Sequence, residues 1–146
     1  EGIVQNSAGA FQVFLPAVVF VVGCLLAFAT GTSWGTFGIL IPITQQVFPA
    51  GDPLSIICIS ACMAGAVCGD HCSPISDTTI MASAGAQCDH VNHVSTQLPY
   101  AVSVAAVSFL CYVAAGLLTA AGLSGLIMLP IGVLSILGVL SVLKNK

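Results

Sequence analysis

Four stretches of the chain are almost continuously apolar, with lengths close to those that membrane helices need. They cover 10–29, 54–69, 100–123 and 126–143. A helix that crosses the hydrocarbon core needs roughly 20 apolar residues, so 54–69 predicts a half-span and the others predict spans. Between the first two lies 30–48, which is apolar but interrupted by Gly, Thr, Ser and Pro. We therefore predict an all-α polytopic membrane protein with about four spanning helices and interrupted or re-entrant segments.

Two short polar segments interrupt this pattern. The first covers 30–36 and separates the span over 10–29 from the broken or re-entrant stretch, which continues to residue 48. The second follows the half-span. There, 70–86 is predicted to be an unwound motif and a short helix, and 87–99 a polar connection. Paired helix interruptions rich in Gly and Pro are the best sequence indication of a binding site inside a transporter.

The composition identifies lipid as the solvent for most of the chain. Of the 146 residues, 58% are hydrophobic and 5% are charged, and the mean hydropathy is +1.10. A soluble domain carries roughly 25% charged residues, so these values exclude a soluble monomer and a disordered segment. The sequence has two lysines, Lys144 and Lys146, and no arginine. Their position at the C-terminal end excludes nucleic-acid binding and predicts a cytoplasmic C-terminus.

Cysteines and the chain start add two expectations. Seven cysteines lie mostly within apolar stretches, where cysteine behaves as a small hydrophobe, so free packed thiols are expected. The Cys and His residues over 68–72 and 88–93 lack the usual zinc spacing, and no enzyme motif occurs. We therefore expect neither a cofactor nor an enzyme. The chain opens at Glu1 without a signal-peptide pattern, and we expect a piece of a longer polytopic protein.

Two acidic residues lie in the second interruption. On insertion scales an acid at the centre of a membrane helix costs about 2.5 to 3.5 kcal/mol, so such residues are usually functional. Asp70 ends an apolar helix, where the helix dipole disfavours more negative charge. Without a nearby Lys or Arg it needs a proton, a cation, a partner such as His71, or a basic residue elsewhere in the protein. Asp77 also suits the N-cap of the short helix that follows.

Hydroxyl side chains surround these acids. One set is Ser73, Ser76, Thr78 and Thr79, and the first interruption adds Thr32, Ser33 and Thr36. Hard cations select carboxylate, hydroxyl and carbonyl oxygens. We predict ion and proton coupling at Asp70 and Asp77, with Na+ ligands from Asp70, Ser73, Asp77, Thr78, Thr79, Thr32 and Ser33. Candidates for pH sensing are His71, His90 and His93.

Small residues in the same regions have a plainer interpretation. Gly31 and Gly35 permit unusual backbone dihedrals in the first interruption, but their spacing also fits close helix packing. Ala61, Gly65 and Gly69 repeat that spacing inside the predicted half-span, and there we predict helix packing alone.

Several motifs together resemble the NhaC family of sodium/proton antiporters. They are GTSWGT at 31–36 with IP at 41–42, GDHCSPISDTTI at 69–80, CDHVNHV at 88–94 and TQLPY at 96–100. The resemblance covers roughly 29–106. It implies the C-terminal part of an inverted-repeat secondary transporter, multi-pass in the plasma (inner) membrane. The partners it implies are the lipid bilayer, Na+, H+ and the remaining N-terminal part of the transporter, and a homo-oligomer is left open.

Two transport functions compete. The first is exchange of Na+ for H+, in which both ions occupy the acidic site at the helix breaks in turn. The alternative is sodium-coupled transport or exchange of a small organic solute, such as an amino acid or a dicarboxylate, because relatives with similar motifs include malate/lactate antiporters and amino-acid carriers. A substrate carboxylate needs positive groups, and this chain offers it helix N-termini. The sequence therefore favours a cation exchanger.

Overall fold

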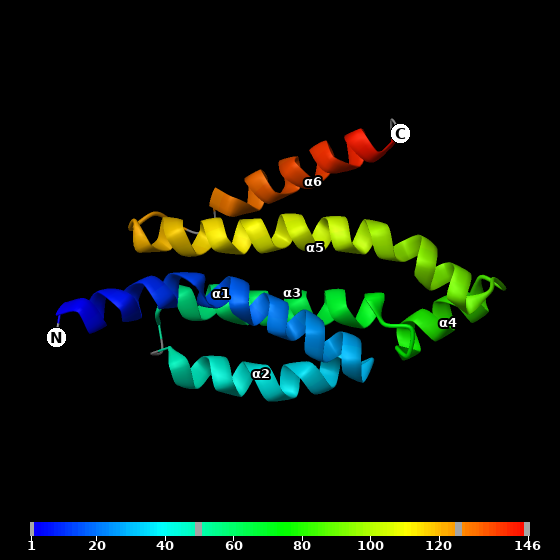
Figure 1. The fold of residues 1–146 in the computed structure, drawn as a ribbon, viewed down its shortest axis with the longest axis horizontal. Helices are drawn as coiled ribbons and strands as arrows, with labels where there is room; N and C mark the ends of the chain where they lie inside the picture. Colours follow the sequence, from blue (N-terminus) through cyan, green and yellow to red (C-terminus); the bar gives the residue numbers. More distant parts are fainter. Residues whose placement is uncertain (1, 49–50, 125–126, 145–146) are drawn as a thin grey trace.

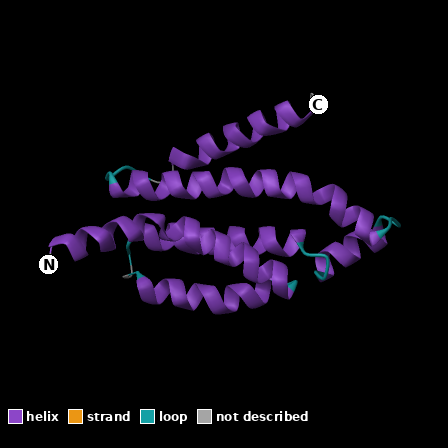
Figure 2. Cartoon of the chain, in the orientation of Figure 1, coloured by secondary structure: helices purple, strands orange, loops and turns teal. Residues whose placement is uncertain are grey.

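The computed structural model describes residues 2–48, 51–124 and 127–144, and the regular elements in these ranges are all α-helices (Figure 2). In chain order they are α1 (Gly2–Thr30), α2 (Ser33–Val47), α3 (Pro53–Cys72), α4 (Asp77–Gly85), α5 (His90–Ala120) and α6 (Met128–Lys144). The predicted all-α class is confirmed.

The helices form a bundle with its two breaks at the same end. α1 and α3 run side by side in the same direction, and α2 folds back along them (Figure 1). α5 returns along α1 and α3, and α6 packs on α5. The turn from α1 to α2 and the connection from α3 to α4 lie at the same end (Figure 1), so the two sequence interruptions come together.

Small residues let α1 and α3 approach backbone to backbone. A Cβ atom added to Gly69 would lie 2.8 Å from the carbonyl carbon of Cys24 and 2.9 Å from the amide nitrogen of Phe28. A Cβ atom on Gly65 would collide with the carbonyl oxygen of Phe20. Ala61 is fully buried in the same interface. The predicted packing role of this small-residue stripe is therefore confirmed.

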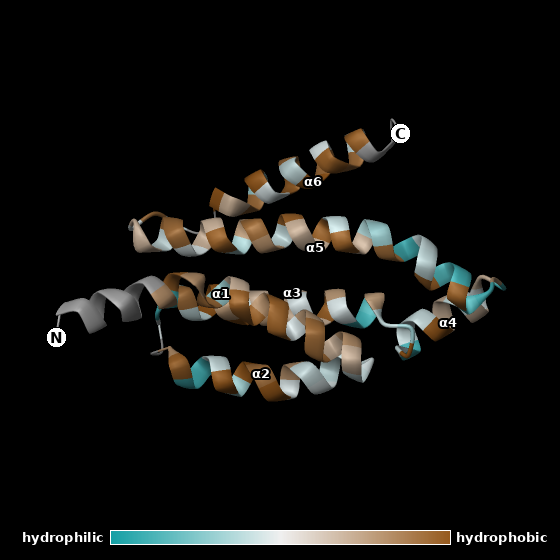
Figure 3. Ribbon diagram, viewed as in Figure 1, coloured by the Kyte–Doolittle hydropathy of each residue, from teal (hydrophilic) through white to brown (hydrophobic). Residues whose placement is uncertain are grey.

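Hydrophobic residues recur along the helices, as the brown bands in Figure 3 show, and many large ones are exposed at the surface of the bundle. Leu25 is 65% exposed and Ile56 is 71% exposed. Among the described residues, three segments are long and apolar enough to cross a membrane, namely Phe11–Thr30 of α1, Pro53–Cys72 and His90–Ala120. The apolar segment Met128–Val142 of α6 is shorter. Lys146 lies outside the described residues, as does the start of the span predicted over 126–143.

Two of the differences between predicted and observed helix boundaries concern the segments next to the second break. The predicted half-span over 54–69 continues to Cys72 and reaches 20 residues, so the unwound part of the motif shrinks to 73–76. The predicted polar connection over 87–99 is helical from His90 onward. There the carboxylate of Asp89 accepts a hydrogen bond from the amide of Asn92 at 2.9 Å and caps the helix. Polar residues are compatible with a helix once its first turn is capped.

Candidate functional site

The break after α3 is fixed by local sequence chemistry. Pro74 disfavours helical dihedrals at Ser73, whose ψ is 128°. The backbone N–H of Ser73 donates to the carbonyl of Asp70 at 3.1 Å, and its hydroxyl donates to the carbonyl of Phe28 in α1 at 2.8 Å. Ser73 has no exposed surface. It therefore anchors the unwound segment 73–76 to the end of α1.

The first break lies against the second. Gly31 has a φ of +68°, a conformation that suits glycine. An added Cβ there would lie 2.9 Å from the carbonyl oxygen of Ile75. Thr32 then caps α2, because its hydroxyl accepts a hydrogen bond from the amide of Gly35 at 3.5 Å. Gly31 thus serves the close approach of the two breaks.

The carboxylate of Asp70 lies where the breaks meet. It is 3% exposed. Oδ1 accepts a hydrogen bond from the Ser76 hydroxyl at 2.6 Å, and Oδ2 accepts one from the Ser33 hydroxyl at 3.2 Å. Ser33 begins α2 and Ser76 precedes α4. One carboxylate therefore joins the starts of two helices that follow different interruptions.

A second hydroxyl extends this cluster outward. The oxygens of Ser76 and Thr78 are 2.8 Å apart. Because the single hydroxyl proton of Ser76 is directed to Asp70, Thr78 donates and Ser76 accepts. Ser76 also accepts from the backbone N–H of Thr78 at 3.2 Å. The result is a chain of hydroxyls from exposed Thr78 through buried Ser76 to Asp70.

Within the part of the chain that the structure describes, the hydrogen-bond donors to the Asp70 carboxylate are neutral hydroxyls. A carboxylate offers about four lone-pair sites, and the two hydroxyls occupy two of them. The chain has no arginine, and its two lysines are residues 144 and 146. A buried charge is costly unless it is paired. The site can therefore lower its free energy by accepting a cation or a proton.

The structure brings part of the predicted site set together. Asp70 and Ser33 are in contact, and Thr78 reaches Asp70 through Ser76. Ser76 was absent from the predicted ligand set, although it makes the shortest hydrogen bond to the carboxylate. A serine directly before a helix start is a typical N-cap, and that signal could have identified it.

Other predicted residues lie at the margin of the site. Thr79 is buried and donates to the carbonyl of His71 at 3.4 Å. Asp77 is exposed, and its side chain makes no hydrogen bond among the described residues. The N-cap prediction for Asp77 is wrong, because Ser76 caps α4 and Asp77 is the first helical residue. An acid in that first turn still interacts favourably with the helix dipole.

The three histidines differ in their surroundings. His71 is exposed, and its Nδ1 lies 3.0 Å from the carbonyl of Val67. His90 contacts the second break, with Nε2 2.6 Å from the carbonyl of Pro74. The side chain of His93 makes no hydrogen bond within the part of the chain that the structure describes. Only His90 therefore touches the unwound segment through a hydrogen bond.

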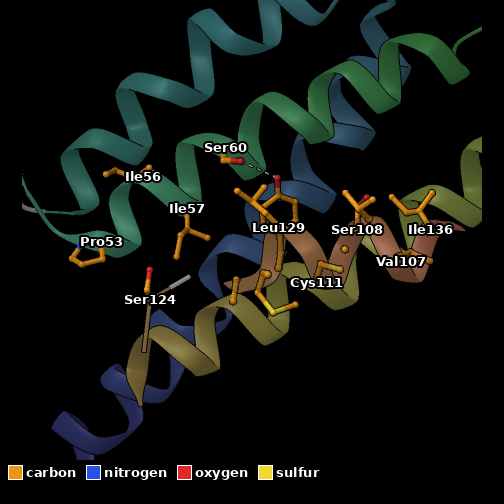
Figure 4. Close-up of a pocket in the computed structure, with 15 residues that line it drawn as sticks. Pro53, Ile56, Ile57, Ser60, Val107, Ser108, Cys111, Ser124, Leu129 and Ile136 are labelled. Atoms are coloured by element: carbon orange, nitrogen blue, oxygen red, sulfur yellow. Dashed lines mark hydrogen bonds between the residues drawn. The ribbon is translucent and has the colours of Figure 1, made fainter. Parts of the chain in front are cut away.

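Two cavities in the described part of the chain lie away from Asp70. One of about 590 Å³ lies between α3, α5 and α6 and has a mainly apolar lining (Figure 4). Its polar groups include Ser60, whose hydroxyl lies 3.1 Å from that of Tyr112. Another, of about 920 Å³, lies between α3 and α5 and includes His71. Neither lining includes Asp70 or the residues bonded to it, so the acidic site is a packed cluster.

The thiols do not form a metal centre within the described residues. All seven cysteines are free. No three side chains of His, Cys, Asp or Glu come together as metal ligands in the described ranges. The chemistry of the breaks is therefore that of oxygen atoms.

Comparisons with known proteins bear on this cluster. The model of the Na+/H+ antiporter family matches residues 1–117. A Haemophilus influenzae protein is 56% identical over 113 residues, which are 77% of this chain and 22% of that protein. A malate-2H+/Na+-lactate antiporter of Bacillus subtilis is 31% identical over 72% of this chain and 22% of its own length. An arginine/ornithine antiporter of Halobacterium salinarum is 34% identical over 73% of this chain and 23% of its own length.

The chain spans about a fifth of the length of these curated relatives. No solved structure matches it.

Proposed function

The chain belongs to the Na+/H+ antiporter family, and from that premise we propose that it supplies an ion site to a secondary transporter that exchanges Na+ for H+. Family membership and the apolar helices make it an integral membrane protein and a component of a transporter. We place the complete transporter in the plasma (inner) membrane, in contact with lipid and with the N-terminal remainder of the same protein.

The observation that carries the proposal is the environment of Asp70. Its carboxylate is 3% exposed, joins two helix breaks, and has hydroxyl donors in place of a basic partner. Intramembrane acids are expensive and usually functional. Discontinuous helices with free carbonyls and oxygen side chains are a common way to hold Na+ or H+ in secondary transporters.

Exchange follows from competition for one carboxylate. A serine hydroxyl can rotate, so the oxygens of Ser33 and Ser76 can donate to Asp70 or present lone pairs to a cation beside it. A proton on Asp70 neutralises the carboxylate and removes the attraction for Na+. A bound Na+ in turn disfavours that proton. Two ions that exclude each other from one site are coupled without contact between them.

The outer oxygens have supporting roles in this proposal. Thr78 lies one hydroxyl away from the carboxylate, and exposed Asp77 places a second negative charge at the start of α4. We assign Asp77 to attracting the cation. Ser73, Thr79 and Thr32 add oxygen atoms near the breaks and hold the backbone there.

The test uses everted membrane vesicles that contain the full-length transporter. Na+ added to vesicles with a preformed pH gradient should collapse that gradient, which a pH-sensitive dye reports. Asp70→Asn should abolish the response. The amide keeps the shape of the carboxyl group, but it cannot take up a proton and carries no negative charge to attract Na+. Normal exchange by that variant would refute the role of Asp70.

A matched control makes the same chemical change at another acid. Asp89 caps α5, and asparagine is an equally good N-cap. Asp89→Asn should therefore exchange Na+ at the wild-type rate, with equal membrane abundance. Equal losses in both variants would point to a general charge effect and contradict a site at Asp70.

A second candidate function is sodium-coupled transport or exchange of a small organic solute. The relatives named as malate/lactate and arginine/ornithine antiporters favour it. In the same vesicles, Na+-dependent uptake of labelled malate or arginine would support this candidate. Na+-driven proton movement in the absence of any organic solute would support the first.

A further inference from the structure

One histidine ties together three parts of the break region. His90 is the first residue of α5 and is half-buried. Its Nε2 lies 2.6 Å from the carbonyl oxygen of Pro74 in the unwound segment 73–76. Its Nδ1 lies 3.1 Å from the hydroxyl oxygen of Ser83 in α4. The ring therefore bridges the break after α3 to the corner between α4 and α5.

Counting donors shows how the ring makes both contacts. The carbonyl of Pro74 only accepts, so Nε2 must donate. With its hydrogen on Nε2, the ring accepts the hydroxyl proton of Ser83 at Nδ1. The same hydroxyl also lies 2.9 Å from the carbonyl oxygen of Ile80, to which it can donate instead. The contact with Pro74 is therefore kept whichever way the Ser83 hydroxyl turns.

Other ionisable groups near this corner have different partners. Those on α3, α4 and the start of α5 are Asp70, His71, Asp77, Cys88, Asp89 and His93. Asp70 bonds to two serines, Asp89 caps the amide of Asn92, and the thiol of Cys88 contacts the carbonyl of Ser83. Within the described residues no hydrogen bond joins any of them to His90, so the hydrogen-bond partners of its ring are the neutral oxygens of Pro74 and Ser83.

The bridge acts on the same segment that presents Ser76 to Asp70. Pro74 lies two residues before Ser76, and the break is also held by Ser73 on the α1 side. The ring of His90 holds the opposite side. Without that contact, the segment keeps its anchor to α1 but loses the one to α5.

We propose that His90 is a positioning residue for the ion site: it donates a hydrogen bond to the carbonyl of Pro74 and so keeps the unwound segment 73–76 in place beside Asp70. Its effect on transport rests on the function proposed above. Its effect on the order of the segment is independent of the cargo.

The first test measures hydrogen exchange by mass spectrometry on the purified full-length transporter. His90→Ala should speed exchange of the amides over 75–80 about fivefold, the effect of one net hydrogen bond. His90→Gln should restore protection, because its amide donates to the same carbonyl. His93→Gln, one turn further along α5, is the matched control and should leave exchange over 75–80 unchanged.

The second test measures transport in everted vesicles. His90→Ala should raise the Na+ concentration for half-maximal response about fivefold with little change in maximal rate, and His90→Gln should reverse most of that rise. If wild type shows no Na+ response while His90→Ala loosens 75–80, the proposed function fails and the positioning role stands. If the amides over 75–80 in His90→Ala exchange hydrogen at the wild-type rate, the positioning role itself is overturned.

If His90→Ala does not insert in the membrane, Ser83→Ala is the variant that tests the proposal. That variant removes one of the two contacts of the ring and should loosen 75–80 by less than fivefold. In that case, unchanged protection of the amides over 75–80 in Ser83→Ala would overturn the proposal.

Discussion

Replacing Ser76 by alanine removes a hydroxyl group that makes hydrogen bonds both to Asp70 and to the start of α4. That oxygen accepts the backbone N–H of Thr78 and caps α4, and its proton goes to Asp70 at 2.6 Å. Ser76 has no exposed surface, so water does not replace either bond. Ser33→Ala is the comparison, because it removes the other donor to Asp70 but caps no helix.

The two variants separate the free-energy contributions. Loss of an N-cap costs about 1 kcal/mol, and loss of a hydrogen bond to a charged group costs about 1.5–3 kcal/mol. Ser76→Ala should therefore destabilise the protein by about 1 kcal/mol more than Ser33→Ala. Both should raise the Na+ concentration for half-maximal exchange by at least about tenfold, since tenfold corresponds to about 1.4 kcal/mol.

The assay titrates Na+ against a preformed pH gradient in everted vesicles, and thermal unfolding of the solubilised full-length transporter gives the stability difference. Ser95→Ala is the control, because its exposed hydroxyl donates to the carbonyl of Asn92 within its own helix at 3.0 Å. A Ser76→Ala titration that matches that of Ser95→Ala would refute the role of Ser76 at the carboxylate. Equal unfolding temperatures for Ser76→Ala and Ser33→Ala would refute the capping contribution.

Three further predictions concern the scaffold, each measured by thermal unfolding of the full-length transporter. Gly65→Ala should destabilise the protein by about 1–3 kcal/mol because its methyl group meets the α1 backbone. Gly38→Ala, with open space around it, should stabilise the protein by up to about 1 kcal/mol. Changes in unfolding free energy of the same sign in both variants would contradict this prediction. Gly31→Ala should cost about 1–3 kcal/mol because φ is +68°, and wild-type stability would argue against that turn. Asp52→Ala should cost about 1 kcal/mol by uncapping α3, and Asp52→Asn should retain wild-type stability.

The helical class and the candidate acid Asp70 could be predicted from the sequence because both depend on local composition. Apolar runs define the helices that cross lipid, and an acid such as Asp70 stands out where charge is scarce. The contact between Ser33 and Asp70 spans 37 positions. It forms because α1 and α3 lie side by side while α2 folds back, and no local pattern encodes that arrangement.

Hydrogen bonds of single side chains explain the remaining differences. Polarity at 87–99 indicates exposure, but it does not oppose a helix, and the carboxylate of Asp89 starts α5 inside the predicted connection. Ser76 and Asp77 are both suitable caps by residue type. The serine caps α4 because the hydroxyl bridges the helix start and Asp70, whereas a second carboxylate there would face the first as a like charge.

The shortage of positive charge limits what these residues can select. Asp70 and its hydroxyls suit a cation or a proton, since they offer acceptor oxygens and protons that can turn away. A malate-like solute carries carboxylates of its own, which two acids in the breaks repel. Binding it requires a guanidinium, an ammonium or helix N-termini, and no Lys or Arg precedes residue 144. If the transporter carries such a solute, its recognition therefore depends on helix N-termini such as those of α2 and α4 or on basic groups beyond this segment, and the coupling that we propose for Na+ and H+ stays at Asp70.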